Sequence, residues 1–573
     1  MTVSLSSPAD AAPAPADLAP THAASTPDLP ATRNSIVRDV FQRRLVGVAE
    51  EMSAALRRSA FSSIIWDMYD YSCALFSADG RMIAQAETIA AQLGVMEIAC
   101  QHIARKIPLD TWQPGDVIVC NDPYQGCTHT PDIVMFTPVF VDGVRVALTS
   151  TIAHHVDIGG KAPCTTVPDN TEVFGEGLIL PPMKIIRAGI ANEEVFAIFA
   201  TNVRMPQAAL GDLRAQIAGC RTGEKRTAEL VTRYGAQRFS DLNEDILDYS
   251  ESYVRAALRR LETVSASASI LIEDDVASPE PIEVRCTLRI ENGEVDVDFS
   301  GTSAQRAHAL NCPYASTVSM VSYAVKAALA PEISQNSGCN RPIRVHALAG
   351  SVLNPKHPGA VGSRHYTQQA VAEAVLRAFE KLLPDFGFAG SQIAFPALKA
   401  GGFDLRPERM VGRNEPRYFA ITDILGGGTG ATSTNNGMDG VDTHGGNCEI
   451  LSAEIMESAC PIRVLRTELV PESGGGGEFT GGRAIRRVYE FLNDDLIVNA
   501  YVQQAQASTR PWGSAGGEPG APGGIIAEPG TPHAHALPSK AIAVKCARGA
   551  TLQLQSSGGG GYGAVQAPLR PGD

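Results

Sequence analysis

The chain has 573 residues, of which 44% are apolar and 19% are charged, so it is long enough for two or three domains with substantial cores. Its formal net charge of −14 argues against nucleic acid as a partner, because phosphate groups would be repelled. No segment is apolar over a membrane-spanning length, and the chain does not start with a basic region followed by an apolar run, so we expect no membrane association and a cytoplasmic protein.

Residues 1–34 are rich in Ala, Pro, Ser and Thr and show no sustained apolar period, which predicts a disordered tail. A helix is expected to start near Ser35, which would act as its N-cap. Apolar residues then recur at helical spacing. They are Val37, Phe41, Leu45, Val48, Met52 and Leu56. This stripe predicts a helix face buried in the core or against another subunit.

A first β-hairpin is predicted from the segment CALFSADGRMIAQ, with its turn at Asp79-Gly80. Asp70 lies just before the first strand of this hairpin. A carboxylate at a strand end could supply a ligand to a site on a neighbouring hairpin.

A second hairpin is predicted around the Asp142-Gly143 dipeptide, which is favoured in two-residue type I′ turns. The segment before the turn is apolar and β-branched, and the segment after it alternates between apolar and polar residues. If Val141 pairs with Val144, then Asp132 lies opposite Ala153. The turn would therefore bring together two clusters of histidine and aspartate that are distant in sequence.

The residues of these two clusters form a candidate metal site. His129 precedes Asp132 by three residues, and His154 and His155 come directly after the residue opposite Asp132. Imidazole and carboxylate ligands suit Zn, Fe or Mn better than Ca or Mg. Strict strand alternation places His155 on the face of Asp132, whereas a bulge or a strand end would select His154. The alternative is that these groups are satisfied polar side chains at strand ends.

The segment from about residue 173 to 261 is predicted to be helical. Within it, Arg204, Asp212 and Gln216 could line a pocket and bind an anionic group of a substrate. They could equally belong to a solvated helix face with ion pairs.

The second half contains clean strand alternation in IEVRCTLRI and GEVDVDFSG and a predicted helix from about Thr367 to Leu383. Its glycine tracts predict loops that allow close backbone approach. None of them contains the GxxxxGK[ST] pattern, so ATP is expected to bind to a partner. Asp442 and His444 form a second cluster, which either contributes to the wall of an active site or stabilises a loop.

These features predict a mixed α/β (α+β), multi-domain fold. After the tail of residues 1–34, we expect an N-terminal metal-site and helical region over residues 35–265. A C-terminal, glycine-rich mixed region would cover residues 266–573. The 12 cysteines are scattered singly, which predicts reduced thiols rather than disulfides.

Several long motifs resemble the B-type subunit of the hydantoinase/oxoprolinase family. They are NDPYQGCTHTPDIVMFTPVF, AHHVDIGG, DYSCALFSADG, NVRMPQAALGDLRAQIAGC, VDFSGTSAQ, NCPYASTVS, ESGGGGEFTGGR and SGGGGYG. The resemblance extends from about Ser35 to the C-terminus. It implies a larger A-type partner subunit that binds ATP and phosphorylates an amide, lactam or enol oxygen. The B-type subunit would carry a metal site for the second step, either hydrolysis of a cyclic amide or imide or carboxylation of a ketone.

The resemblance also implies a set of metal ligands. They are Asp70, His129, Asp132 and His154. This choice favours His154 over His155 against simple alternation. His155 and Asp157 would then be available to orient a ligand or act as a general base, although Asp157 could equally be a turn residue. Cys127 replaces the glycine usual in the family, which could alter the loop or add a soft ligand near the metal.

Together these observations predict the metal-binding catalytic B-type subunit of an ATP-dependent cyclic amide hydrolase. The small-molecule substrate would be a hydantoin, a lactam or a ring like 5-oxoproline. The metal would be Zn, Fe or Mn, and the A-type partner would use ATP within a hetero-oligomer. The alternatives are a subunit of an ATP-dependent ketone carboxylase and a non-catalytic scaffold subunit, the latter disfavoured by the intact ligand residues.

Overall fold

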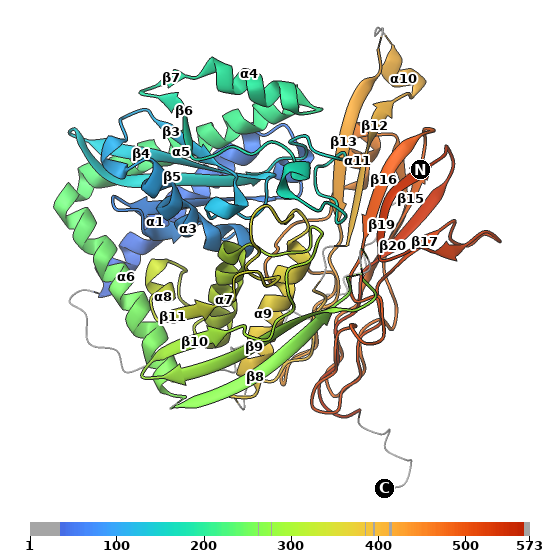
Figure 1. The fold of residues 1–573 in the computed structure, drawn as a ribbon. Helices are drawn as coiled ribbons and strands as arrows, with labels where there is room; N and C mark the ends of the chain where they lie inside the picture. Colours follow the sequence, from blue (N-terminus) through green and yellow to red (C-terminus); the bar gives the residue numbers. More distant parts are fainter. Residues whose placement is uncertain are drawn as a thin grey trace, which may run out of the picture.

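The computed structural model describes residues 35–565, except for 262, 275, 277, 384–385, 394–395 and 412–414. The tail predicted for residues 1–34 lies outside the described residues. In the described part, helices and mostly antiparallel sheets are mixed, as predicted, and four sheets form the framework (Figure 1). No helix within these ranges is both long and apolar enough to cross a membrane. The predicted boundary after residue 265 falls inside strand β8 (Val264–Ile272), and this division stays a prediction.

The N-terminal half is built on a seven-stranded sheet with the order β2-β1-β5-β4-β3-β6-β7. Helix α3 (Ala90–Lys106) covers one face, and α1 (Ser35–Ser59) and α5 (Pro206–Tyr234) cover the other. The strands are β1 (Tyr71–Ser77), β2 (Met82–Gln85), β3 (Val117–Cys120), β4 (Asp132–Val141), β5 (Val144–His154), β6 (Met183–Arg187) and β7 (Ile190–Ala191). Because both faces are covered, β4 is apolar along almost its whole length rather than alternating.

Three sequence predictions for this half are confirmed. Helix α1 begins at Ser35, and the predicted stripe from Phe41 to Leu56 is buried. The β1–β2 hairpin turns at Asp79-Gly80, with a positive φ of 89° at the glycine. The β4–β5 hairpin turns at Asp142-Gly143, where φ is 51° and 78°, as a type I′ turn requires.

The predicted helical segment from about residue 173 to 261 is confirmed only in its later part. That part contains α4 (Glu193–Asn202), α5 and α6 (Ala236–Arg259). The first part was predicted wrongly, because it forms a 3₁₀ turn, η3 (Val173–Glu176), followed by the β6–β7 hairpin. The Ala188-Gly189 pair takes positive φ values of 47° and 84°, which closes a hairpin instead of continuing a helix.

A second, four-stranded sheet has the order β11-β10-β9-β8 and packs against helix α9 (His365–Glu380). Its remaining strands are β9 (Ile282–Glu291), β10 (Glu294–Asp298) and β11 (Ile343–His346). Burial alternates along β9 and β10, which confirms the strand prediction for both segments. Helices α7 (Tyr314–Leu329) and α8 (Ser337–Asn340) lie between this layer and the N-terminal half.

Two further sheets form the C-terminal part, coloured orange to red in Figure 1. The first has the order β13-β12-β16-β19, with β12 (Ala397–Asp404), β13 (Arg417–Ile424), β16 (Leu496–Tyr501) and β19 (Lys540–Cys546). The second has the order β14-β15-β20-β17-β18, with β14 (Ile462–Leu469), β15 (Ile485–Phe491), β17 (Gly524–Ala527), β18 (His535–Ala536) and β20 (Thr551–Gln555). Short helices are α2 (Ser63–Trp66), α10 (Pro407–Met410) and α11 (Ala453–Ala459), with 3₁₀ turns η1 (Leu109–Thr111) and η2 (Pro123–Gln125).

The glycine tracts of the second half pack against one another through their backbones. The Gly559 N–H donates to the Gly482 carbonyl at 2.9 Å, and the Gly482 N–H donates to the Thr429 carbonyl at 2.9 Å. A Cβ atom at Gly559 would lie 1.8 Å from the Thr429 carbonyl oxygen. The predicted close backbone approach is therefore correct, and it serves contacts between tracts.

Candidate metal centre

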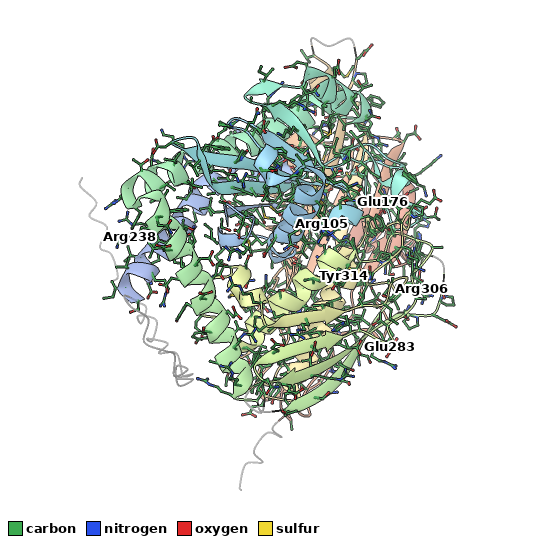
Figure 2. All side chains as sticks on the ribbon, turned by 60° about the vertical axis from the view of Figure 1, so that its left-hand side comes forward. Arg105, Glu176, Arg238, Glu283, Arg306 and Tyr314 are labelled. Atoms are coloured by element: carbon green, nitrogen blue, oxygen red, sulfur yellow. The ribbon has the colours of Figure 1, made fainter. Side chains whose placement is uncertain are left out.

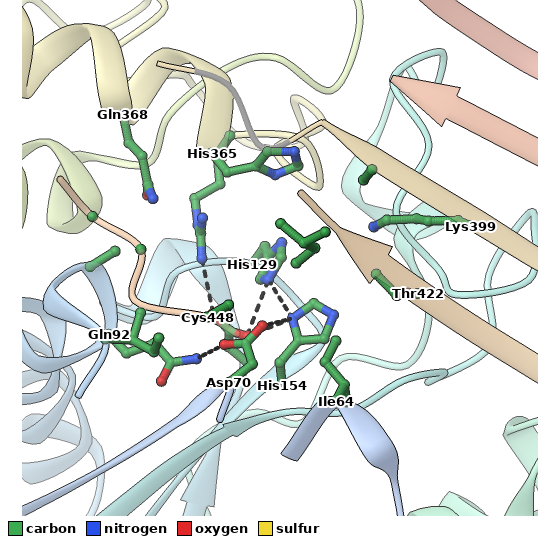
Figure 3. Close-up of a pocket in the computed structure, with 18 residues that line it drawn as sticks. Ile64, Asp70, Gln92, His129, His154, His365, Gln368, Lys399, Thr422 and Cys448 are labelled. Carbon is green, nitrogen blue, oxygen red and sulfur yellow. Dashed lines mark hydrogen bonds and ion pairs between the residues drawn. The ribbon is translucent and has the colours of Figure 1, made fainter. Parts of the chain in front are cut away.

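The candidate ligands gather at one end of the seven-stranded sheet (Figure 3). Asp132 begins β4 and His154 ends β5, and the two strands are antiparallel, so these residues lie side by side. Strand β1 pairs with the other edge of β5, which places Asp70 next to His154. The His154 N–H donates to the Asp70 carbonyl at 3.0 Å. Three segments that are distant in sequence therefore meet at one point.

The register of the β4–β5 hairpin decides which histidine faces Asp132. Pairing starts as predicted with Val141 opposite Val144, but a β-bulge at Val146 shifts it by one residue. Asp132 therefore lies opposite His154, and the predicted pairing with Ala153 is wrong. A directly opposed pair shares one face of the sheet, so the backbone selects His154 over His155.

Three side-chain atoms converge in this position. Asp132 Oδ1 lies 3.2 Å from His129 Nε2 and 3.0 Å from His154 Nδ1, and the two histidine nitrogens are 3.2 Å apart. Ligands held about 2.1 Å from one ion are separated by about 3.0–3.4 Å in octahedral or tetrahedral geometry. The three atoms therefore form a face of the right size for a divalent transition metal.

The tautomer of His129 supports this interpretation. Its Nδ1 lies 2.8 Å from the carbonyl oxygen of Gly362, which can only accept a hydrogen bond. Nδ1 therefore carries the proton, and Nε2 presents a lone pair to Asp132 and His154. Burial lowers the pKa of His129 to about 4, so the ring is neutral near pH 7. A neutral, oriented imidazole is the form that binds a metal.

The two carboxylates are held by separate partners. Asp132 Oδ2 accepts hydrogen bonds from the Thr128 hydroxyl at 2.6 Å and from Arg364 Nη2 at 2.9 Å, which leaves Oδ1 facing the histidines. Burial alone would raise the pKa of Asp132, but the adjacent histidines outweigh it and hold the pKa well below its ordinary value. Asp70 accepts from Gln92 Nε2 at 2.7 Å, and its other oxygen lies 3.9 Å from His154 Nδ1.

The ligands open into a buried cavity of about 60 Å³. Its opposite wall comes from the second half of the chain: Arg364, His365 and Gln368 on or beside α9, Lys399 on β12, Thr422 on β13, and Gly445, Gly446 and Cys448 from a glycine-rich loop. The N-terminal half therefore supplies the candidate ligands, and the C-terminal half supplies most of the cationic groups.

Sequence reasoning missed these cationic residues. Basic side chains at a helix N-terminus are disfavoured by the helix dipole, so Arg364 and His365 at the start of α9 were a signal of function. Lys399 stands within the apolar run AFPALKAGGF, which was a second signal. Burial lowers the pKa of Lys399 to about 8 and holds that of His365 well below its ordinary value.

Glu176, labelled in Figure 2, was also missed and lies behind the ligands. Its buried carboxylate accepts hydrogen bonds from the N–H groups of Val361 and Gly362, at 2.9 and 2.5 Å. Its backbone carbonyl accepts from the hydroxyl of Thr130. Because Gly362 orients His129 and Thr130 follows it, Glu176 fastens this ligand from two sides. Burial raises the pKa of Glu176 to about 8.

The structure places His155 outside the cavity. Its Nε2 lies 3.0 Å from Gln216 Oε1, and its ring packs edge-on against Phe199, with the centroids 5.9 Å apart. Gln216 donates in turn to the carbonyl of Ile133 at 2.7 Å. Neither His155 nor Gln216 lines the cavity, so their predicted catalytic and substrate-binding roles stay predictions.

The other predicted residues also lie apart from the ligands. Asp157 accepts hydrogen bonds from Arg204, at 2.7 Å from Nη1 and 2.9 Å from the backbone N–H. Asp212 accepts from the N–H groups of Phe61 and Ser62, at 2.7 and 3.1 Å, at the start of α2. These contacts hold chain segments together, and none of the three predicted residues lines the cavity.

The remaining candidates surround the site without facing it. Cys127 and Cys164 are buried and do not line the cavity, and burial raises the pKa of both thiols. His444 Nε2 lies 3.1 Å from a carboxylate oxygen of Glu373, and Asp442 accepts from the N–H of Cys448 at 2.8 Å. Gly445 and Gly446 of the same segment form part of the cavity wall, whereas Asp442 and His444 do not.

Comparison with known proteins agrees with this geometry. The model of the hydantoinase B/oxoprolinase family matches residues 34–565. The chain belongs to this family.

Relatives of this family member carry names that refer to cyclic amides. The B-type chain of a "Putative D-/L-hydantoinase" from Pseudomonas sp. (strain NS671) is 30% identical over 91% of this chain and 88% of its own length. The 5-oxoprolinase 1 of Arabidopsis thaliana is 30% identical over 92% of this chain, which spans 41% of that longer protein.

Two solved structures share the fold of this family member. The ATP-dependent caprolactamase from Pseudomonas jessenii superposes with a TM-score of 0.86 at 27% identity, covering 94% of this chain and 93% of that one. A nucleotide-free acetone carboxylase superposes with a TM-score of 0.82 at 19% identity, covering 93% of this chain and 76% of that one. The second likeness shows the fold alone.

Proposed function

We propose that this chain is the metal-binding catalytic B-type subunit of an ATP-dependent cyclic amide hydrolase. The observation that carries the proposal is the convergence of His129, Asp132 and His154 atoms within 3.2 Å at a buried cavity. The names hydantoinase, oxoprolinase and caprolactamase all refer to ring amides, which supports a hydantoin, lactam or 5-oxoproline-like substrate.

The ligands would be His129, Asp132 and His154, with Asp70 as the fourth. Three of these donor atoms already have the spacing of a coordination face, and the donor set suits Zn, Fe or Mn. A divalent ion held there would polarise an amide oxygen and lower the pKa of a water molecule.

The chain's own residues prepare this site. Arg364 and Thr128 hold Asp132 Oδ2, so that Oδ1 faces the cavity. Gln92 fixes Asp70 in the same way. Ile64, Ile89 and Ile424 contribute apolar surface to the cavity, which limits access of bulk water and strengthens the electrostatic interactions inside it.

ATP-dependent activation of the substrate would be the task of an A-type partner subunit in a cytoplasmic hetero-oligomer. The glycine tracts support this division, because they hydrogen-bond to one another and lack the P-loop pattern. The Pseudomonas relative is named as one subunit of a hydantoinase, which points the same way.

The test is ring opening by the chain co-purified with its A-type partner. Hydantoin, 5-oxoproline and caprolactam are supplied with ATP, and acetone with bicarbonate serves as the carboxylase arm. We expect ATP-dependent ring opening that Asp132→Asn abolishes together with bound metal.

Asp157→Asn is the matched control, because Asp157 is also buried and paired with an arginine but lies outside the cavity. We expect this variant to keep its metal, and its turnover tests the catalytic role predicted for Asp157. Ring opening that survives Asp132→Asn, or turnover with the ketone and bicarbonate alone, would contradict the proposal.

A further inference from the structure

Lys399 is a buried lysine in the wall of the metal cavity. It lies on β12, an inner strand of its sheet, and is only 5% exposed. Figure 3 shows its side chain pointing from β12 toward His129 and His154. Its position faces the candidate ligands from the opposite half of the chain.

The ammonium group of Lys399 lacks a partner within the protein. Among the described residues, no hydrogen bond or ion pair within 4.0 Å reaches its Nζ. Burying an unpaired charge is costly, so such a group is retained where a ligand completes it. Because its pKa of about 8 remains above neutrality, the group is still mostly charged at pH 7.

Neighbouring polar atoms share this lack of partners. Thr422 lies directly opposite Lys399 on β13, and its buried hydroxyl has no nitrogen or oxygen partner in the described chain. Arg364 uses Nη2 for Asp132, but its buried Nε has no partner there. All three side chains line the same cavity and can donate hydrogen bonds.

The charges that line the cavity point to an anionic ligand. The carboxylates of Asp70 and Asp132 offset the cations of Arg364 and Lys399, so a divalent ion would leave two positive charges without a counterpart. A substrate that carries an oxyanion would restore the balance.

We propose that Lys399, with Thr422 and Arg364 Nε beside it, binds an oxyanion of the substrate across the cavity from the metal ligands. The oxyanion belongs either to the phosphoryl group added during ATP-dependent activation or to a carboxylate of the substrate. This inference rests on the proposed function, because it concerns the same site. It assigns Lys399 to the binding of substrate and not of metal.

The test compares Lys399→Met, which keeps the length of the side chain, with Lys399→Arg, which keeps the charge. Metal content is measured first by elemental analysis of the full chain. Calorimetry of the metal-loaded proteins then gives the affinity for inorganic phosphate and for acetate. We expect all three proteins to hold metal and Lys399→Met to lose roughly thirtyfold or more in affinity for one probe. Lys399→Arg should retain most of that affinity.

The probe that loses affinity identifies the source of the oxyanion. Phosphate indicates the activated group, and acetate indicates a substrate carboxylate. Unchanged affinity for both probes in Lys399→Met, or binding of neither probe by the unaltered chain, would overturn the inference. Absence of metal from the unaltered chain would instead contradict the proposed function.

A second measurement needs no substitution. Acetic anhydride labelling of the unaltered chain, read by mass spectrometry at Lys399, should slow when the recognised anion is present. Labelling at the same rate with and without either anion would also overturn the inference. Exposed Lys161 serves as the internal reference.

Discussion

Arg364 Nη2 lies 2.9 Å from Asp132 Oδ2, and this buried ion pair joins two residues from opposite halves of the chain. Asp132 begins a strand of the seven-stranded sheet, whereas Arg364 immediately precedes α9. The contact turns one carboxylate oxygen away from the histidines and leaves the other facing them. The site therefore depends on the packing of the C-terminal half against the hairpin that carries the ligands.

Substitution of Arg364 should weaken metal binding. In Arg364→Met, Asp132 loses its charged partner and its orientation, so we expect the affinity for zinc to fall by about 10- to 100-fold. Competition with a chromophoric chelator gives the dissociation constant. Arg204→Met removes a comparable arginine–aspartate pair outside the cavity and should leave the affinity nearly unchanged. Equal losses in both variants would indicate a general effect on folding.

Glu176 should make the metal-free protein less stable as the pH rises. The ordinary pKa of a glutamate is 4.5, and burial raises that of Glu176 to about 8. Between these values the folded state keeps a proton that the unfolded chain releases, so its contribution to the free energy of unfolding falls from about pH 5 to pH 8.

Glu176→Gln stays neutral, so its unfolding midpoint should change less over this pH range than that of the unaltered protein. The difference should be on the order of a few kcal/mol in unfolding free energy. Denaturant titrations at pH 5, 6, 7 and 8 measure it, with exposed Glu172→Gln as the control. Parallel curves for Glu176→Gln and the unaltered protein would refute the assignment.

Metal affinity should fall as the medium becomes more acidic. Burial raises the pKa of Asp70 to about 6, so protons compete for this ligand below that pH. We expect Asp70→Asn to bind zinc more weakly at pH 7 and to show a shallower loss between pH 7 and pH 5. Zinc affinities at half-unit intervals provide the measurement, and identical slopes would exclude Asp70 as a ligand.

Local sequence signals predicted the framework of the site. The Asp79-Gly80 and Asp142-Gly143 turns fixed both hairpins, because few residue pairs tolerate positive φ in a two-residue loop. The pattern also drew attention to His129 and Asp132, which lie on the turn and strand of one local unit. These features depend on neighbours in sequence, and they were predictable for that reason.

Features that depend on tertiary packing were not predictable in this way. The bulge at Val146 carries no glycine and shifts the register by one residue, which moved the partner of Asp132 from Ala153 to His154. Lys399 and Arg364 reach the site from segments more than 200 residues away. Their roles follow only from the way the sheets pack.

The metal content of two adjacent histidine variants tests the central claim most directly. His154 and His155 are both buried, but His154 lies in the ligand cluster and His155 contacts Gln216 outside it. Elemental analysis of the full-length protein should find about one divalent transition metal per unaltered chain, a near-complete loss in His154→Asn, and retention in His155→Asn. Loss in His155→Asn with retention in His154→Asn, or no metal in the unaltered chain, would contradict the account.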